Sequence, residues 1–281
     1  MYSNEQYEAT YRQPWEKEPR SLESLGSRQI PGYRVKTIRS GQMLECEIYP
    51  LWNTRQAAGR AKKCRPSRKA QENLNDKNAR KWMVRLINTN FTQRDLWMTL
   101  TCDDQHLPED DEAAEKMIRN FIRRIQYRRK KRRLSSLRYV YVVEHREETK
   151  TNPGIRYHFH LILSGDMDRD ELEQMWTGGG RREAHRLQPD ECGLEGLARY
   201  ITKAKKGKRR WGSSKNLKKP LITVADHKVR RKHAENIARN ENLAPEYFER
   251  LYPGYWFHDV KIFRSQYVAG VYLYVRMRRL Q

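Results

Sequence analysis

The sequence lacks the features of membrane proteins and of disulfide-linked proteins. No window approaches the roughly 18 consecutive apolar residues that a membrane-spanning helix requires, and the first 20 residues contain no apolar export segment. The four cysteines, Cys46, Cys64, Cys102 and Cys192, lie far apart with no C-x-x-C pair, so neither a zinc site nor a disulfide framework is expected. We therefore expect an unexported, cytoplasmic protein with reduced thiols that makes no contact with a membrane.

Acidic residues are too few to balance the basic ones. The 281 residues include 58 Lys and Arg against 35 Asp and Glu, which gives a formal net charge of +23. A surface this positive favours polyanions, because bound phosphates release their counterions. Nucleic acid is therefore the first partner to consider. Charge alone also suits ribosomal and membrane-surface proteins, and it indicates no reaction.

Apolar residues are scarce at the N-terminus and become periodic further along the chain. Residues 1–32 are polar and contain three prolines, so we predict a flexible N-terminal arm. Residues 33–90 predict an accessory hairpin, turning at Ser40-Gly41, and a long amphipathic helix. Residues 91–220 form the predicted core, and a C-terminal helix and strand in 221–281 complete or extend it. No internal repeat is present.

The core shows strand and helix periodicities in turn. These predict strands at 96–102, 138–145 and 156–164, a short strand at 183–187 after three glycines, and helices at 110–133, 169–176 and 194–203. A basic loop at 203–220 and a charged helical region follow, with a last strand at 271–277. The turn at Asn152-Pro153-Gly154 predicts that the strands beside it pair as an antiparallel hairpin. We expect an α+β fold with an antiparallel sheet and helices on one face.

Two histidines stand one residue apart in an apolar strand. In a strand, alternate residues share a face, so His158 and His160 lie together while Phe159, Leu161 and Leu163 face the opposite side. Two imidazoles on one face can bind the same metal ion. An H-x-H pair by itself is a weak signal, and the neighbouring strand is needed to decide.

The neighbouring strand supplies Glu144. If the hairpin turns around Thr151, Glu144 lies directly opposite His158; a turn one residue later places it opposite His160. Either register gathers two histidines and one carboxylate around one cation, whereas His145 faces the other way. A surface ion pair is the alternative role for Glu144, and a nonheme iron oxygenase is an alternative use of the same ligand set.

A tyrosine and a lysine lie one helical turn apart at Tyr200 and Lys203. A phenol of pKa near 10 is only about 0.1% ionised at neutral pH, which a nucleophilic site must offset by roughly 4 kcal/mol. A nearby ammonium and a metal ion could together supply that free energy. The alternative is a packed helix tyrosine beside a solvent-exposed lysine.

These motifs together resemble those of the HUH endonucleases, in particular the rolling-circle replication initiators of bacterial plasmids, phages and integrative elements. The strand Trp97-Met98-Thr99-Leu100-Thr101 resembles the first family motif, His158-Phe159-His160 the second, and Tyr200-x-x-Lys203 the third, in the family's order. The tracts 186–190 and 211–220 resemble rolling-circle replication-associated proteins. Position 204 is Ala204, so a second tyrosine one helical turn after Tyr200 is absent.

The resemblance implies a ferredoxin-like (RRM-like) sheet of the HUH endonuclease fold and a role for each motif. Tyr200 would be the sole nucleophile, with Lys203 positioning the scissile strand. His158, His160 and Glu144 would bind Mg²⁺ or Mn²⁺. The product would be a 5′-phosphotyrosine and a free 3′-OH that primes replication. No general base is apparent, although His185 is a candidate.

DNA contacts are expected in the first motif and in the basic loop. The expected contact residues are Thr99, Thr101, Lys205, Lys206, Lys208, Arg209, Arg210, Trp211, Lys215, Lys218 and Lys219. The expected partners are single-stranded and hairpin origin DNA, with host helicase and polymerase as candidates, in the bacterial cytoplasm. The rival functions are a single-tyrosine transposase, a relaxase and a noncatalytic DNA-binding protein.

Overall fold

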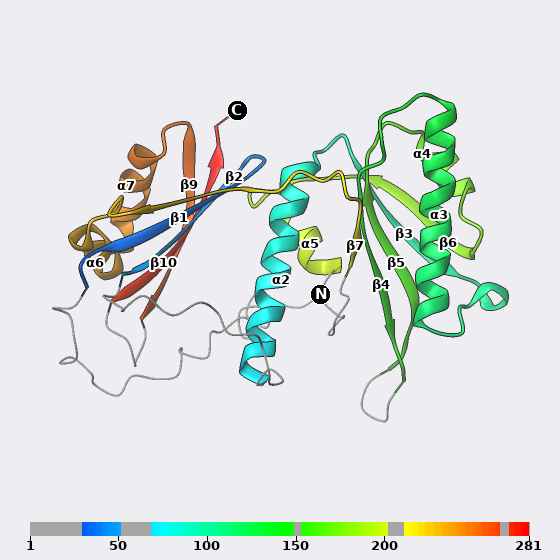
Figure 1. Cartoon of the computed structure of the whole chain (residues 1–281), viewed down its shortest axis with the longest axis horizontal. Coiled ribbons are helices and arrows are strands. Elements are labelled where there is room, and N and C mark those ends of the chain that lie inside the picture. The colour runs from blue at the N-terminus through cyan, green and yellow to red at the C-terminus, as the bar shows by residue number, and fades with distance from the viewer. Residues whose placement is uncertain (1–29, 52–68, 149–152, 202–210, 265–269, 281) are drawn as a thin grey trace, which may run out of the picture. The chain divides into compact units, whose positions relative to one another are not determined.

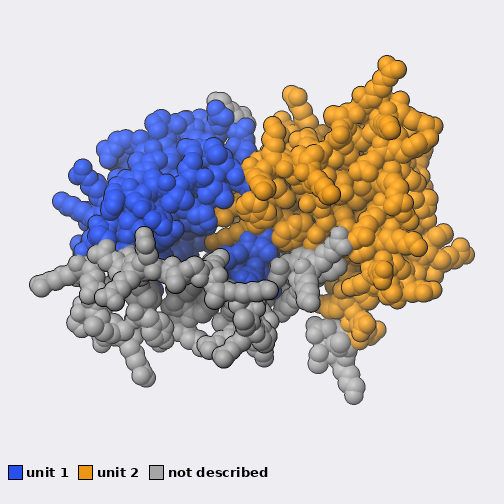
Figure 2. Space-filling model, viewed as in Figure 1, with its two compact units in different colours: residues 1–79, 220–281 blue, residues 80–219 orange. Residues whose placement is uncertain are grey.

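The computed structural model describes residues 30–51, 69–148, 153–201, 211–264 and 270–280. The chain divides into two compact units (Figure 2). One comprises residues 80–219, and the other combines residues 1–79 with 220–281. Each unit has its own antiparallel five-stranded sheet (Figure 1), which confirms the expected α+β class. No helix in the described ranges is long and apolar enough to cross a membrane.

The sheet of residues 80–219 has the two-histidine strand at its centre. Its strands are β3 (Leu96–Cys102), β4 (Tyr139–Arg146), β5 (Ile155–Leu163), β6 (Gly179–Arg186) and β7 (Gly212–Ser213), in the spatial order β6-β3-β5-β4-β7. Every neighbouring pair is antiparallel. Side chains on β5 therefore have neighbours from β3 on one side and from β4 on the other.

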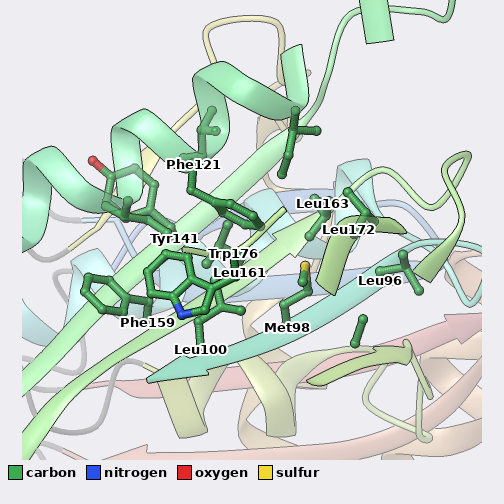
Figure 3. Close-up of a cluster of buried hydrophobic side chains, with 14 of the residues drawn as sticks. Leu96, Met98, Leu100, Phe121, Tyr141, Phe159, Leu161, Leu163, Leu172 and Trp176 are labelled. Carbon is green, nitrogen blue, oxygen red and sulfur yellow. The ribbon is translucent and has the colours of Figure 1, made fainter. Parts of the chain in front are cut away.

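One face of this sheet packs against α3 (Asp111–Lys131) and α4 (Arg169–Gln174). The helix α3 begins where the Asp110 side chain accepts a hydrogen bond from the Ala113 amide. Phe121 of α3, Phe159 of β5 and Trp176 meet in the buried cluster shown in Figure 3. The indole of Trp176 also donates to the Thr101 carbonyl at 2.8 Å. This apolar layer turns the alternate residues of β5, including both histidines, to the opposite face.

The opposite face is partly covered by α2 (Lys69–Asn90) and α5 (Glu195–Ile201), so helices lie on both faces rather than on one as expected. Met83 and Ile87 of α2 pack with Val140 and Val142 of β4. The physical reason is visible in β4, where residues 140–143 are all buried. A strand that is apolar on both faces needs a packed layer on each.

The second sheet brings the two ends of the chain together. Its strands are β1 (Tyr33–Ser40), β2 (Met43–Pro50), β8 (Leu221–Asp226), β9 (Tyr255–Arg264) and β10 (Val271–Arg279), in the order β8-β1-β2-β10-β9. The helices α6 (Arg231–Arg239) and α7 (Ala244–Leu251) pack on one face. Two single-turn helices, η2 (Asp104–His106) and η3 (Glu241–Leu243), complete the described elements.

This sheet differs from the expected arrangement of the chain ends. The predicted hairpin is present, with Gly41 at a φ of 59° in its turn. However, the C-terminal strand pairs with this hairpin and does not extend the core sheet. The strands β8 and β9 lie in a region for which the sequence predicts helix. Residues of β8 are exposed throughout and those of β9 half-buried throughout nearly all its length, so neither shows the period of two that identifies a strand.

Candidate active site

The two histidines and the glutamate share one face, in the first of the two predicted registers. Glu144 is directly opposite His158, and Val142 is opposite His160. The turn that sets this register falls in residues 149–152, outside the described residues. His145 faces the other side as expected, where its ring stacks on Tyr157 with centroids 3.9 Å apart. The hairpin therefore brings Glu144, His158 and His160 together.

His160 is the most enclosed of the three side chains, with 2% exposure. Its Nε2 atom lies 3.4 Å from the Glu144 Oε2 atom, diagonally across the strands. Its Nδ1 atom lies 3.5 Å from the Thr99 hydroxyl, and its ring stacks on Trp97 with centroids 5.8 Å apart. Contacts on both sides thus hold the imidazole with one nitrogen directed toward the carboxylate.

His158 is oriented by the backbone of its own strand. Its Nδ1 atom lies 2.5 Å from the Arg156 carbonyl oxygen. A carbonyl can only accept, so Nδ1 carries the proton, and in the neutral ring Nε2 keeps its lone pair for a ligand. Metal-binding histidines are commonly fixed in this way by a hydrogen bond from the other ring nitrogen. The arrangement suits a histidine that ligates through Nε2.

The donors fit a small divalent cation. Two ligand atoms that each lie about 2.1 Å from one ion are separated by roughly 3.0 to 3.4 Å, and Glu144 Oε2 and His160 Nε2 are 3.4 Å apart. No group of three His, Cys, Asp or Glu side chains in the described ranges is already gathered as a metal site. Glu144 and His160 thus have the spacing of two ligands, and His158 would have to turn about its side-chain bonds to join them.

Tyr200 lies over this face, carried by α5. Ala198 and Ile201 are buried against the sheet, which leaves the intervening Tyr200 56% exposed. Its ring meets the edge of His160 with centroids 5.7 Å apart and that of Trp97 at 6.2 Å. The structure thus brings the predicted nucleophile, nearly 40 residues further along the chain, to the predicted metal ligands.

Two charged residues of β6 border the same site, and the sequence analysis missed them. Arg181 donates to Glu183 at 2.5 Å, and Glu183 pairs with Thr99 across the sheet. The hydrogen bond from Arg181 lowers the pKa of Glu183. The pKa of Arg181 is raised chiefly by Glu183 and to a smaller extent by Tyr200, which places the phenol within electrostatic range of the guanidinium.

The missed residues could have been found from the strand that carries them. We expected that strand to begin near residue 183, but β6 begins at Gly179. Gly179 has a φ of +77°, and a β-carbon there would overlap the Asp103 carboxylate. Glycine can therefore open this strand as well as end the preceding helix. Once the strand begins at 179, the alternation places Arg181, Glu183 and His185 on one face.

The other predicted site residues have varied positions. Thr101 accepts a hydrogen bond from the Arg181 backbone amide at 2.7 Å, so its hydroxyl joins β3 to β6. Trp211 packs against the buried cluster beneath α2 and α5. The side chains of Lys215, Lys218 and Lys219 are exposed. His185 lies 3.4 Å from Glu183 and has no described contact with Tyr200. Lys203, Lys205, Lys206, Lys208, Arg209 and Arg210 lie outside the described residues.

Comparison with known proteins gives one match. Residues 95–205 match a family model described as a replication-associated protein of the ORF2 type. The matched segment begins just before β3 and ends after α5, so it contains Trp97, Glu144, both histidines and Tyr200. No curated protein matched the chain. No solved structure matched it either. The family match supports a role in DNA replication for this part of the chain.

Proposed function

From the similarity to replication-associated proteins, we propose that the chain is a replication initiator that nicks and rejoins DNA. It cleaves one strand at an origin with Tyr200 as the nucleophile, leaving a 5′-phosphotyrosine and a free 3′-OH. The observation that carries the proposal is the position of the exposed Tyr200 ring, 5.7 Å from His160 on the face that also bears Glu144. The family match supports replication, and the site geometry supports the chemistry.

The residues of the site have complementary tasks in this proposal. Glu144, His158 and His160 hold Mg²⁺ or Mn²⁺, which supplies positive charge beside a nonbridging oxygen of the scissile phosphate. Thr99 and Trp97 keep His160 in its orientation. Arg181 adds a second positive charge within range of the phenol oxygen, where it favours the phenolate and binds a phosphate oxygen.

The bonds and protons of the proposed step balance without a further reactant. The Tyr200 oxygen forms a bond to phosphorus as its proton leaves to solvent, to which the phenol is exposed. The bond from phosphorus to the 3′ oxygen breaks, and that oxygen takes up a proton. The phosphotyrosine remains a phosphodiester, so a 3′-OH can later attack it and rejoin the strand without ATP.

The decisive experiment looks for the covalent adduct. The full chain is incubated with Mn²⁺ and single-stranded oligonucleotides, and a DNA-linked band is sought on a denaturing gel. We expect wild type to form an adduct located on Tyr200 by mass spectrometry, and Tyr200→Phe to bind DNA without forming one. Tyr127→Phe is the matched control, because Tyr127 is similarly exposed, at 62%, but lies on α3. It should form the adduct at the wild-type rate.

The metal ligands are tested by binding as well as by cleavage. Mn²⁺ affinity is measured by calorimetry on wild type, His158→Ala and Glu144→Gln. We expect each variant to bind Mn²⁺ at least tenfold more weakly and to need more Mn²⁺ for adduct formation. Unchanged Mn²⁺ affinity in both variants would remove this face as the metal site. Tight oligonucleotide binding without any adduct in wild type would instead indicate a noncatalytic DNA-binding protein.

A further inference from the structure

A groove lies beside the C-terminal end of α3, at the end of β4 far from Glu144. Its volume is about 610 Å³. One wall comes from α3, one from the turn that leads into β4, and one from β7 and the residues after it. The lining is rich in hydroxyl, amide and ammonium groups, contributed by Gln126, Lys130, Ser135, Ser136, Ser213, Ser214, Lys215 and Asn216 among others.

The walls of the groove are joined by hydrogen bonds. Asn216 donates from its side chain to the carbonyls of Ser136 and Leu137, both at 3.3 Å. The Ser214 hydroxyl accepts from the Tyr139 amide at 3.1 Å. On the other side, buried Arg129 donates to the Ser135 carbonyl at 2.7 Å. These bonds hold the polar lining in place before any ligand binds, which lowers the entropy cost of binding.

The charges around the groove fall into two groups. Arg128 and Arg132 pair with Glu171, and Arg129 pairs with Asp166, so acids within the protein already serve these three. Lys130 and Lys215 line the groove and are exposed, and neither ammonium has an acidic partner among the described residues. A favourable helix dipole explains basic residues at the end of α3. It does not explain a second lysine contributed by another element.

A second hollow, of about 580 Å³, continues the positive surface. It shares Ser135 with the groove and is lined by Arg94, Arg138 and Arg186. Arg138 is partly satisfied by Asp95 at 3.5 Å, whereas Arg186 donates to backbone carbonyls, including Gly165 at 2.9 Å. Lysines and arginines therefore follow one another along this end of the sheet.

We propose that this groove binds the phosphate backbone of duplex DNA next to the nicking site. Single-strand sites need exposed aromatic rings on which bases stack. The one aromatic residue in the lining, Tyr139, is half-buried and stacked on Tyr141. Hydroxyls, amides and lysines without an exposed ring instead match phosphate and sugar contacts. The ligand is therefore the backbone of a duplex.

The position of the groove sets the length of duplex required. Tyr139 in the groove and Glu144 in the site are five residues apart on β4, or roughly 17 Å at about 3.4 Å per residue. The same length corresponds to about five base pairs of duplex. A duplex that begins at the nicking site would thus reach the groove after about half a helical turn. The inference rests on the proposed function only for this spacing from the scissile strand.

The test compares variants that each lose two positive charges. The full chain carries either Lys130→Gln with Lys215→Gln, or Lys116→Gln with Arg182→Gln, two exposed residues away from the groove. Affinity for a fluorescent mixed-sequence duplex is measured over a range of NaCl concentrations. Each lost phosphate contact lowers the slope of log affinity against log salt by about one. We expect a loss of about two for the groove variant and less than one for the control.

Two further measurements distinguish the outcomes. Affinity for a single-stranded oligonucleotide should be equal in the two double variants. On a duplex shortened to about three base pairs beside a single-stranded tail, the two should also bind equally. Equal slopes on the long duplex would overturn the inference, as would an equal loss on single strands. Adduct formation is followed in the same samples, so that a failure of the groove and a failure of the Tyr200 chemistry are seen separately.

Discussion

At the scale of single residues, the candidate site combines two sources of positive charge around one phenol. One is the cation site at Glu144 and His160, whose facing atoms are 3.4 Å apart. The other is Arg181, which Glu183 holds by a 2.5 Å hydrogen bond and which lies within electrostatic range of Tyr200. Both are placed to stabilise negative charge on a phosphate attacked by Tyr200.

Arg181→Gln should slow adduct formation at saturating oligonucleotide by about 10- to 100-fold, because it removes a charge that acts as the phosphate is attacked. Arg181→Lys should recover part of the rate, since it restores the charge but not the fork-shaped donor. Arg182→Gln is the matched control, because Arg182 pairs with Leu100 and therefore lies on the opposite face. If Arg181→Gln weakens binding alone and leaves the saturated rate unchanged, Arg181 contacts DNA without assisting the reaction.

At the scale of elements, one buried charge joins α3 to the loop that follows β5. Arg129 has only 2% of its side chain exposed, and it forms a two-point pair with Asp166, which is 41% exposed. The same guanidinium donates to Ser135 in the turn that leads into β4. A buried cation without its carboxylate is costly, so this pair helps to determine where α3 ends against the sheet.

Asp166→Asn should destabilise the chain by about 3 kcal/mol, because it leaves Arg129 buried without a countercharge. Arg129→Met should cost less, since the remaining Asp166 is partly solvated. The hydrogen bond from Arg129 lowers the pKa of Asp166, so its stabilisation is present above the unfolded value near 3.9 and is lost as the pH falls through the lower folded value. Urea unfolding from pH 7 to 3 measures both effects. An Asp166→Asn variant with wild-type acid dependence would contradict this assignment.

At the scale of the whole molecule, the chain is built as two units with separate cores. The cluster around Phe121 and Trp176 and the cluster beneath α2 and α5 both belong to residues 80–219. The third cluster is formed by residues from both ends of the chain. The segment that matches replication-associated proteins, 95–205, lies wholly within the first unit. The proposed chemistry therefore needs only one of the two units.

A fragment of residues 69–219, which keeps α2 intact, should fold cooperatively and form the Tyr200 adduct on single-stranded oligonucleotides. The reason is that its two hydrophobic clusters are complete without the second sheet. Circular dichroism on heating and the adduct assay check this, with the full chain as the reference. An unfolded fragment, or a folded one without an adduct, would show that the second unit completes the site.

The site could be predicted from the sequence wherever the information was local. Period-two alternation determines that His158 and His160 share a face, because successive side chains of a strand point to opposite sides. The position of the turn then limits Glu144 to one of two registers, and the structure has the one with Glu144 opposite His158. The basic composition determines the class of partner to consider, since it depends on the sum of the charges and not on their positions.

Only the tertiary structure decided which distant residues meet. That Tyr200 lies over His160 depends on the packing of α5 against α2 and β4, and that Arg181 borders the site depends on β6 pairing with β3. The two ends of the chain form a second sheet through pairings between strands more than 170 residues apart, such as Arg39 with Leu221. Neighbouring residues carry no signal for such contacts, because their free energy comes from surfaces that become complementary only after the chain has folded.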